Sequence, residues 1–323
     1  MLRRRGRIRQ VRISPELDDR DLRRVLAEIR PSHQLHGLGA DRTGAAWQPV
    51  ADLLRATGHD WDRRTHRISV LARTLPPAVA DRWATVRPDS PDAAVVQAQV
   101  LAGRAPEHGR EAAARAEQLC IRAAEACPAD PTPWVALLSL LRAMRVPVRH
   151  AKPVWNEIAV RDPWNRRAHH ELLRYISPRE CGSLVGMSGF ARRVAETAPH
   201  GSPLALLPLA ARTEHYGHRL RPGSPDALGA GTHWHGPGVA EEIDTALTRW
   251  FDTPAQPHAQ AMADLNLLAF VLIRTQRLPE AARAFRRIGR HMTLYPWDLA
   301  QVQDPDHDPV GTFLYWSTRE TGS

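Results

Sequence analysis

The chain has 323 residues, of which 43 % are hydrophobic, and it carries 44 Lys and Arg against 35 Asp and Glu. This composition excludes a disordered tail, because it supplies enough apolar residues for a folded core. The longest uncharged apolar run, at 265–273, is far shorter than a membrane span of roughly 20 residues, so no membrane partner is expected. With only 3 Cys and no apolar stretch after the first arginines, we expect a cytoplasmic protein without disulfides or a signal peptide.

Basic charge is concentrated at the N-terminus, where residues 1–30 are expected to form a basic arm followed by a first helix. The basic residues of the arm are Arg3, Arg4, Arg5, Arg7, Arg9 and Arg12. Such a run can bind nucleic-acid phosphates or another acidic surface, and the alternatives are a disordered arm or an overextended start site. A short strand is also expected over 7–13, where Arg9, Val11 and Ile13 share one face.

Helical patterns dominate the rest of the sequence and predict an all-α protein. The apolar face of the first helix is formed by Leu22, Val25, Leu26 and Ile29. Residues at this spacing lie on one side of a helix and are typical of a buried stripe. Similar patterns predict an N-terminal helical region at 31–87 and a helix over 112–127. Within the apolar stripe of the helix over 112–127, Cys120 is expected to pack as a small core residue.

Serine–proline pairs indicate where several helices begin. Serine accepts a hydrogen bond at the helix N-cap, and proline fits the first helical position because it has no N–H to satisfy. Ser90 precedes Pro91 in this way. Ser177 precedes Pro178, and its spacing from Glu180 is that of a capping box. We therefore expect helices to begin at about 91 and 178.

Prolines recur at nearly regular intervals in the segment 88–220. Pro88, Pro128, Pro163 and Pro199 are separated by 40, 35 and 36 residues. This is the length of one helix–turn–helix unit with its connection. Each interval carries two helical patterns, for example 133–144 followed by 153–160. The segment is therefore predicted to consist of helix pairs.

The clearest single helix pair lies further on, at 265–296. Ala281 stands where tetratricopeptide helices cross, and Phe285 matches that family's aromatic position; Ile288 departs from it, because a small residue is usual there. With the proline spacing, these residues resemble a degenerate tetratricopeptide-repeat protein. The chain is also similar to actinobacterial proteins with tetratricopeptide-like helices. The resemblance implies an array of antiparallel helix pairs, a tetratricopeptide-like α-solenoid with a concave surface.

A Gly/Pro-rich loop is expected at 221–240, before the C-terminal helices over 241–323, and histidines gather around it. The candidate metal ligands are Glu214, His218, His233 and His235. Two of these would share a helix face and two would come from the loop, a set that favours a divalent metal. The HExxH spacing of metalloproteases is absent. Exposed histidines, in a chain that has 16 of them, are the alternative.

The sequence contains no Walker A motif, no GxSxG motif and no CxxC pair, so common enzyme classes are not indicated. We expect no cofactor other than the metal considered above. The leading hypothesis is an interaction or scaffold protein that binds a protein or peptide segment on a concave helical surface, with Trp234 as a candidate anchor. The alternatives are a helical metal-dependent enzyme that uses 214–235 and a protein that binds nucleic acid through its arginine arm.

Overall fold

The computed structural model describes residues 11–29, 45–224, 227–254, 257–302, 304 and 306–321. Within this part of the chain, almost all regular structure is helical, which confirms the all-α prediction. The two strands found there, β1 (Arg12–Ile13) and β2 (His291–Met292), pair in parallel. β1 confirms the end of the strand expected over 7–13, and residues 7–10 lie outside the described residues.

The chain divides into two compact units. The N-terminal unit comprises Asp19–Ile176 and Glu180–Gly182, and the C-terminal unit comprises the described residues of Met1–Asp18, Ser177–Arg179 and Ser183–Ser323. The division thus falls near residue 180. It runs through the segment 88–220, which the sequence indicated as one run of helix pairs.

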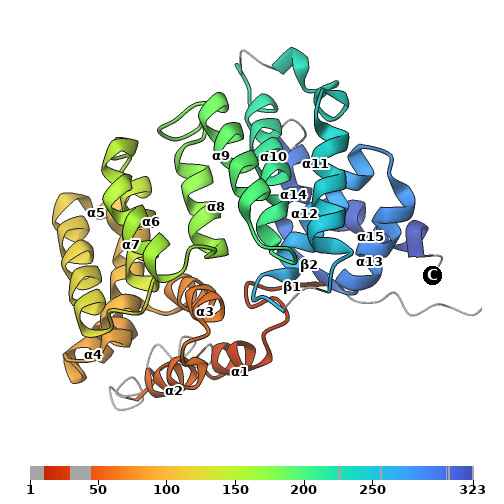
Figure 1. Ribbon diagram of the computed structural model, residues 1–323. Coiled ribbons are helices and arrows are strands. Elements are labelled where there is room, and N and C mark those ends of the chain that lie inside the picture. Colours follow the sequence, from red (N-terminus) through yellow and green to blue (C-terminus); the bar gives the residue numbers. More distant parts are fainter. Residues whose placement is uncertain are drawn as a thin grey trace, which may run out of the picture. The chain divides into compact units, whose positions relative to one another are not determined.

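Helices follow one another along the N-terminal unit (Figure 1). They are α1 (Arg20–Ile29), α2 (Gln48–Thr57), α3 (Trp61–Thr74), α4 (Pro77–Val86), α5 (Pro91–Ala126), α6 (Thr132–Ala143), the short η2 (Val148–His150), α7 (Ala151–Arg161) and α8 (Arg166–Tyr175). Ser90 caps α5 as predicted, because its hydroxyl accepts the Ala93 N–H at 3.2 Å. Within α5, Gly109 has φ 79° and ψ −165°, so the backbone turns there and the label covers two helices. Glycine adopts this positive φ without steric cost.

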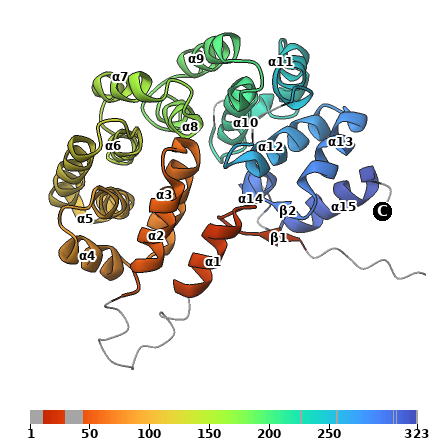
Figure 2. The ribbon, with the colours of Figure 1, turned by 60° about the horizontal axis from the view of Figure 1, so that its bottom comes forward.

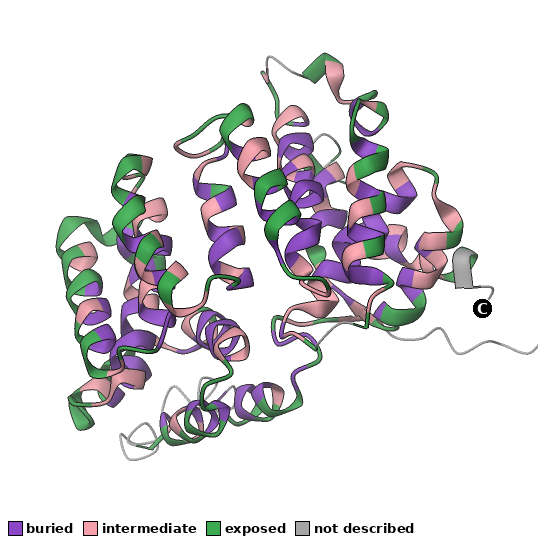
Figure 3. Cartoon of the chain, in the orientation of Figure 1, coloured by how far each residue is buried: buried purple, intermediate pink, exposed green. Residues whose placement is uncertain are grey.

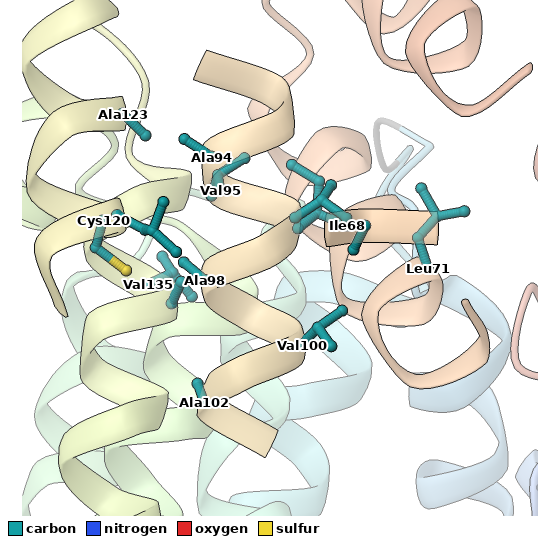
Figure 4. Close-up of a cluster of buried hydrophobic side chains, with 14 of the residues drawn as sticks. Ile68, Leu71, Ala94, Val95, Ala98, Val100, Ala102, Cys120, Ala123 and Val135 are labelled. Atoms are coloured by element: carbon teal, nitrogen blue, oxygen red, sulfur yellow. The ribbon is translucent and has the colours of Figure 1, made fainter. Parts of the chain in front are cut away.

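The two halves of α5 pack together in the core of the N-terminal unit (Figure 4). Ala94 lies near Ala123 and Ala98 lies near Cys120, so the halves run in opposite directions. The small side chains allow the two backbones to approach closely. Cys120 is buried, and burial raises the pKa of its thiol to about 12. The prediction that this cysteine is a small core residue is confirmed.

The C-terminal unit is also helical. Its elements after β1 are α9 (Leu184–Thr197), η3 (Pro203–Leu206), α10 (Leu207–Arg219), η4 (Ala227–Gly229), η5 (His233–His235), α11 (Val239–Ala246), η6 (Leu247–Phe251), α12 (Ala261–Arg274), α13 (Leu278–Ile288), β2, α14 (Leu294–Trp297), η7 (Asp298–Val302) and α15 (Pro309–Thr321). Many helices bury one face and expose the other (Figure 3). α13 packs on α12, and Ala281 and Phe285 are buried.

The capping box predicted at Ser177 and Glu180 is wrong. α9 begins after Ser183, whose hydroxyl accepts the Gly186 N–H at 3.1 Å. The intervening segment forms a tight turn. At Gly182, an added Cβ would lie 2.1 Å from the Ile176 carbonyl oxygen. This close return of the backbone to the end of α8 leaves no room for a helix that starts at residue 178.

Candidate functional site

The residues predicted as metal ligands lie in two elements of the C-terminal unit. Glu214 and His218 belong to α10, and His233 and His235 belong to η5. Glu214 lies 3.4 Å from Arg179, in an ion pair. In the part of the chain that the structure describes, no three His, Cys, Asp or Glu side chains are grouped so that they could hold a metal ion. The four predicted ligands are therefore not brought together, and metal binding stays a prediction.

His233 packs against His215, which was not among the predicted ligands. The centroids of their rings are 5.2 Å apart. His233 Nε2 is 2.9 Å from the Arg212 carbonyl oxygen, and Nδ1 is 3.4 Å from the Arg219 guanidinium. Burial is the main cause that lowers the pKa of His233 to about 4. His233 is therefore neutral near pH 7, and we assign a tautomer in which Nε2–H donates to the carbonyl and Nδ1 accepts from Arg219.

A cavity of about 390 Å³ lies between α9, α10, η5 and α11. Its charged groups already have partners within the described residues. Arg212 Nε donates to Glu242 at 2.7 Å, and Arg192 lies 3.7 Å from the same carboxylate. Arg219 Nε donates to His215 Nε2 at 3.2 Å. Because these cations are already engaged, this cavity is a weak candidate for a charged ligand.

A second cavity, of about 470 Å³, has five aromatic side chains in its lining, and we call it the aromatic cavity. Its rings belong to Tyr216 of α10, Trp234 of η5, Phe270 of α12, Trp297 of α14 and Trp316 of α15. The other lining residues are Ala230, Gly231, His235, Ile273, Arg274, Gln276, His307 and Thr312. Ligand sites are typically concave and apolar, with a few polar groups that fix the orientation of the ligand. The aromatic cavity has this character.

The rings of the aromatic cavity hold one another in place. Ring centroids are 5.3 Å apart for Tyr216 and Trp234, 5.9 Å for Trp234 and Phe270, and 5.6 Å for Phe270 and Trp297. The last two pairs are close to perpendicular, at 79° and 87°. Edge-to-face contacts of this kind are favourable because the positive edge of one ring meets the negative face of the next. The wall is therefore formed before any ligand arrives.

Arg274 contributes the cation of this cavity. Its guanidinium carbon lies 5.6 Å from the centroid of Tyr216 and 5.2 Å from that of Phe270, which is one turn earlier in α12. Its side chain makes no hydrogen bond or ion pair with another described residue. Cation–π contacts orient the guanidinium but leave its N–H donors without acceptors there. A carboxylate inside the cavity would supply these acceptors.

Trp234, the predicted anchor for a partner, is only 5 % exposed. Its ring packs between Tyr216 and Phe270, so it forms part of the wall and does not project toward a partner. Its Nε1–H is buried and has no hydrogen-bond partner among the described residues. A buried donor without an acceptor costs free energy. A ligand that brings an acceptor within reach of this N–H would offset that cost.

The arginine arm is only partly within the described residues. Arg3, Arg4, Arg5, Arg7 and Arg9 lie outside them. Arg12 lies in β1, and its backbone N–H donates to the Arg290 carbonyl at 2.8 Å. One guanidinium nitrogen of Arg12 is buried, without a hydrogen-bond partner in the described segments. Arg12 is therefore held within the C-terminal unit, and nucleic-acid binding by the other five arginines stays a prediction.

The sequence matches no protein-family model and no curated protein. The resemblance to tetratricopeptide proteins therefore stays a prediction from the residues themselves. Among the described helices, none combines the length and the apolar character that crossing a membrane requires.

Sequence reasoning did not single out Phe270 or Arg274. One signal was present, because Arg274 follows the longest apolar run of the chain and stands four residues after Phe270. This spacing brings a cation beside an aromatic ring on a helix. Trp316 belongs to an aromatic cluster at 313–316 that indicates a docked C-terminal segment, but its position beside the other rings depends on how distant helices pack.

Proposed function

We propose that this chain is a protein-interaction or scaffold protein whose aromatic cavity holds a segment of a partner protein. The aromatic cavity carries the proposal, because it joins a preformed wall of rings to one cation without a carboxylate partner among the described residues. The spacing of the helices fits an array of tetratricopeptide-like antiparallel pairs, an architecture that commonly presents binding surfaces. Architecture alone does not define function, so the cavity is the main support.

The lining favours one kind of segment. The rings would bury an aromatic or large aliphatic side chain, which is the usual anchor of a protein interface. Arg274 favours a carboxylate next to that side chain and disfavours a second cation. We therefore propose a segment in which Asp or Glu adjoins Phe, Trp or Leu.

The distribution of exposure in the cavity also fits a protein segment. Trp234 and Ile273 are buried at its lining, whereas His235 and Gln276 are exposed. A buried apolar centre with a polar, accessible rim is the arrangement found where proteins bind proteins. The rim would contact the backbone of the segment while its side chain enters the cavity.

Fluorescence polarisation with labelled short peptides tests the proposal. One pool carries Asp next to Phe or Leu, and the matched pool carries Asn in place of Asp. We expect the Asp pool to bind about tenfold more tightly, because a hydrogen bond to a charged group contributes about 1.5–3 kcal/mol. Arg274→Gln should remove the difference between the pools. The control Arg286→Gln changes an exposed arginine of α13 and should preserve it.

A second variant tests whether the cavity itself is occupied. At Gly231, an added Cβ would meet no atom within 4 Å, so Gly231→Phe adds a ring to the lining without a clash at Cβ. We expect this variant to abolish binding of the Asp pool and to keep the helical circular dichroism of the parent. Equal binding of the two pools by the parent, or unchanged binding by Gly231→Phe, would contradict the proposal.

A further inference from the structure

In the N-terminal unit, α3 and α8 contact each other (Figures 1 and 2). Several arginines belong to these two helices. On α8, Arg167, Glu171 and Arg174 are spaced by four and three residues, so they share one side of the helix. On α3, His66 and Arg73 are seven residues apart and also share a side. We call Arg73, Arg167 and Arg174 the arginine cluster.

The carboxylates of this region already have cationic partners. Glu171 is 2 % exposed, accepts a hydrogen bond from Arg142 Nε and lies 3.7 Å from the Arg167 guanidinium. Glu180 lies 3.3 Å from Arg142. The buried Glu171 carboxylate therefore interacts with two guanidinium groups, and the Glu180 carboxylate interacts with Arg142. Positive charge exceeds negative charge at this face.

Two members of the arginine cluster have no anionic partner at contact distance. The side chains of Arg73 and Arg174 make no hydrogen bond or ion pair with another residue of the described ranges, and both residues are exposed. The Arg167 side chain is only 20 % exposed. Burial is the main cause that lowers the pKa of Arg167 to about 10; Glu171 opposes this shift, and the charges of Arg73 and Arg174 contribute to it. A bound anion would stabilise the cationic form that these neighbours destabilise.

His66 is a second indication that a ligand binds at this face. It is 3 % exposed, and its Nε2 has no hydrogen-bond partner in the described part of the chain. Burial, followed by the charge of Arg167, lowers the pKa of His66 to about 3, so the ring is neutral at physiological pH. Buried polar atoms usually have a partner, which can be water or a ligand. His66 therefore adds a polar atom to the cluster without adding charge.

We propose that Arg73, Arg167 and Arg174 bind the phosphate of a phosphomonoester. Guanidinium groups bond to phosphate oxygens in pairs, and several of them suit a group that carries close to two negative charges near neutral pH. Along α8 the cluster extends over seven residues, or about 10 Å. This length fits one phosphate with its donors, whereas a nucleic-acid strand would need a longer row of cations. A phosphorylated side chain and a small phosphorylated molecule share this chemistry.

Isothermal titration calorimetry of the full chain tests the proposal, with ionic strength held constant by NaCl. The probes are phosphoserine, a phosphoserine peptide and the same peptide without phosphate. We expect saturable binding of phosphoserine and none of the unphosphorylated peptide. Tighter binding of the phosphopeptide would identify a protein as the source of the phosphate, and equal binding would identify a small molecule.

Matched variants separate the cluster from general charge. Arg174→Gln should weaken phosphoserine binding about tenfold, since it removes a charged hydrogen-bond donor. Arg82→Gln removes the same charge from an exposed position of α4 and should change binding by less than about twofold. Absence of saturable binding, or equal weakening by both variants, would overturn the proposal. The proposal would also be overturned by a DNA duplex that binds more tightly than the phosphopeptide and competes with it.

This inference does not depend on the proposed partner of the aromatic cavity. Arg274→Gln changes the C-terminal unit and should leave phosphoserine binding unchanged. Arg174→Gln changes the N-terminal unit and should leave the preference for Asp peptides unchanged. Failure of one proposal is therefore distinguishable from failure of the other.

Discussion

The two units differ in what accompanies their apolar cores: buried arginine–aspartate pairs in the N-terminal unit and a group of packed aromatic rings in the C-terminal unit. In the N-terminal unit, buried Arg64 lies 2.7 Å from Asp130 and 2.5 Å from Asp92. Buried Arg67 lies 2.8 Å from Asp19. Both arginines are on α3, which is thereby tied to other segments by directed bonds. A buried charge must keep its partner, so this interior depends on single residues.

In the C-terminal unit, Trp297 lies at the centre of a group of aromatic rings. Its ring lies 5.6 Å from Phe270, 6.0 Å from Phe285 and 5.5 Å from Phe313. Its Nε1–H donates to Asn266 at 3.0 Å. These rings carry no charge, and a central ring such as Trp297 packs against several neighbours. The N-terminal unit should therefore be sensitive to the loss of one buried charge, while the C-terminal unit should tolerate conservative changes of its rings.

The largest expected effect is the loss of a buried cation. Arg64→Leu would leave Asp130 and Asp92 without their guanidinium, and we expect unfolding to become easier by about 3–5 kcal/mol. Urea unfolding followed by circular dichroism measures this change. The control Arg55→Gln breaks an exposed ion pair with Asp52 and should cost less than about 1 kcal/mol. Similar costs for the two variants would contradict the comparison.

Acid should act next most strongly. Burial is the first cause that lowers the pKa of His66 to about 3 and of His169 to about 4, whereas an unfolded histidine titrates near 6.5. Below pH 6.5 the unfolded chain therefore binds protons that the folded chain does not, and stability falls with pH. By about pH 5 each histidine should have cost about 2 kcal/mol.

The acid effect can be assigned to the N-terminal unit. Hydrogen exchange at about pH 7.5 and about pH 5, corrected for intrinsic rates, reports on each unit separately. In the C-terminal unit the pKa of His233 is likewise lowered to about 4, and burial also lowers the pKa of the partly buried His291. With one histidine instead of two at a value this low, the C-terminal unit should lose less stability. His66→Leu should remove about half of the loss in the N-terminal unit. An equal loss in both units, unaffected by this variant, would show that other groups control the response.

The smallest expected effect is a conservative change of a ring. Phe285→Leu keeps an apolar side chain among Trp297 and Phe313, and we expect it to cost less than about 1.5 kcal/mol. The shift in the urea midpoint measures the cost. A loss as large as that of Arg64→Leu would show that the aromatic interior is as intolerant as the paired charges.

The helices could be predicted from the sequence because their signals are local. The patterns at 133–144 and 153–160 correspond to α6 and α7 with ends within about two residues, which is the usual uncertainty of a helix boundary. Cys120 could be placed in the core for the same reason, since its neighbours along the stripe are apolar. Spacing within one helix decides which face is buried.

The sites could not be predicted in the same way. Arg64 and Asp130 are 66 positions apart, and Arg67 and Asp19 are 48 apart. Nothing in the local pattern indicates that these charges meet. The predicted metal ligands failed to converge because proximity in sequence does not fix the direction of side chains on α10 and η5. Trp234 lines the aromatic cavity, and its burial depends on rings from distant helices.

The pairing of β1 with β2 has a consequence for how the protein is made. Arg12 pairs with His291, and Ile13 pairs with Met292, so each pair joins residues that are 279 positions apart. On the ribosome, the first strand emerges long before its partner is translated. The N-terminal unit can fold during that interval, whereas the C-terminal unit must wait for nearly the whole chain. A fragment cut near residue 180 would part β1 from β2, so the C-terminal unit cannot be produced intact by simple truncation.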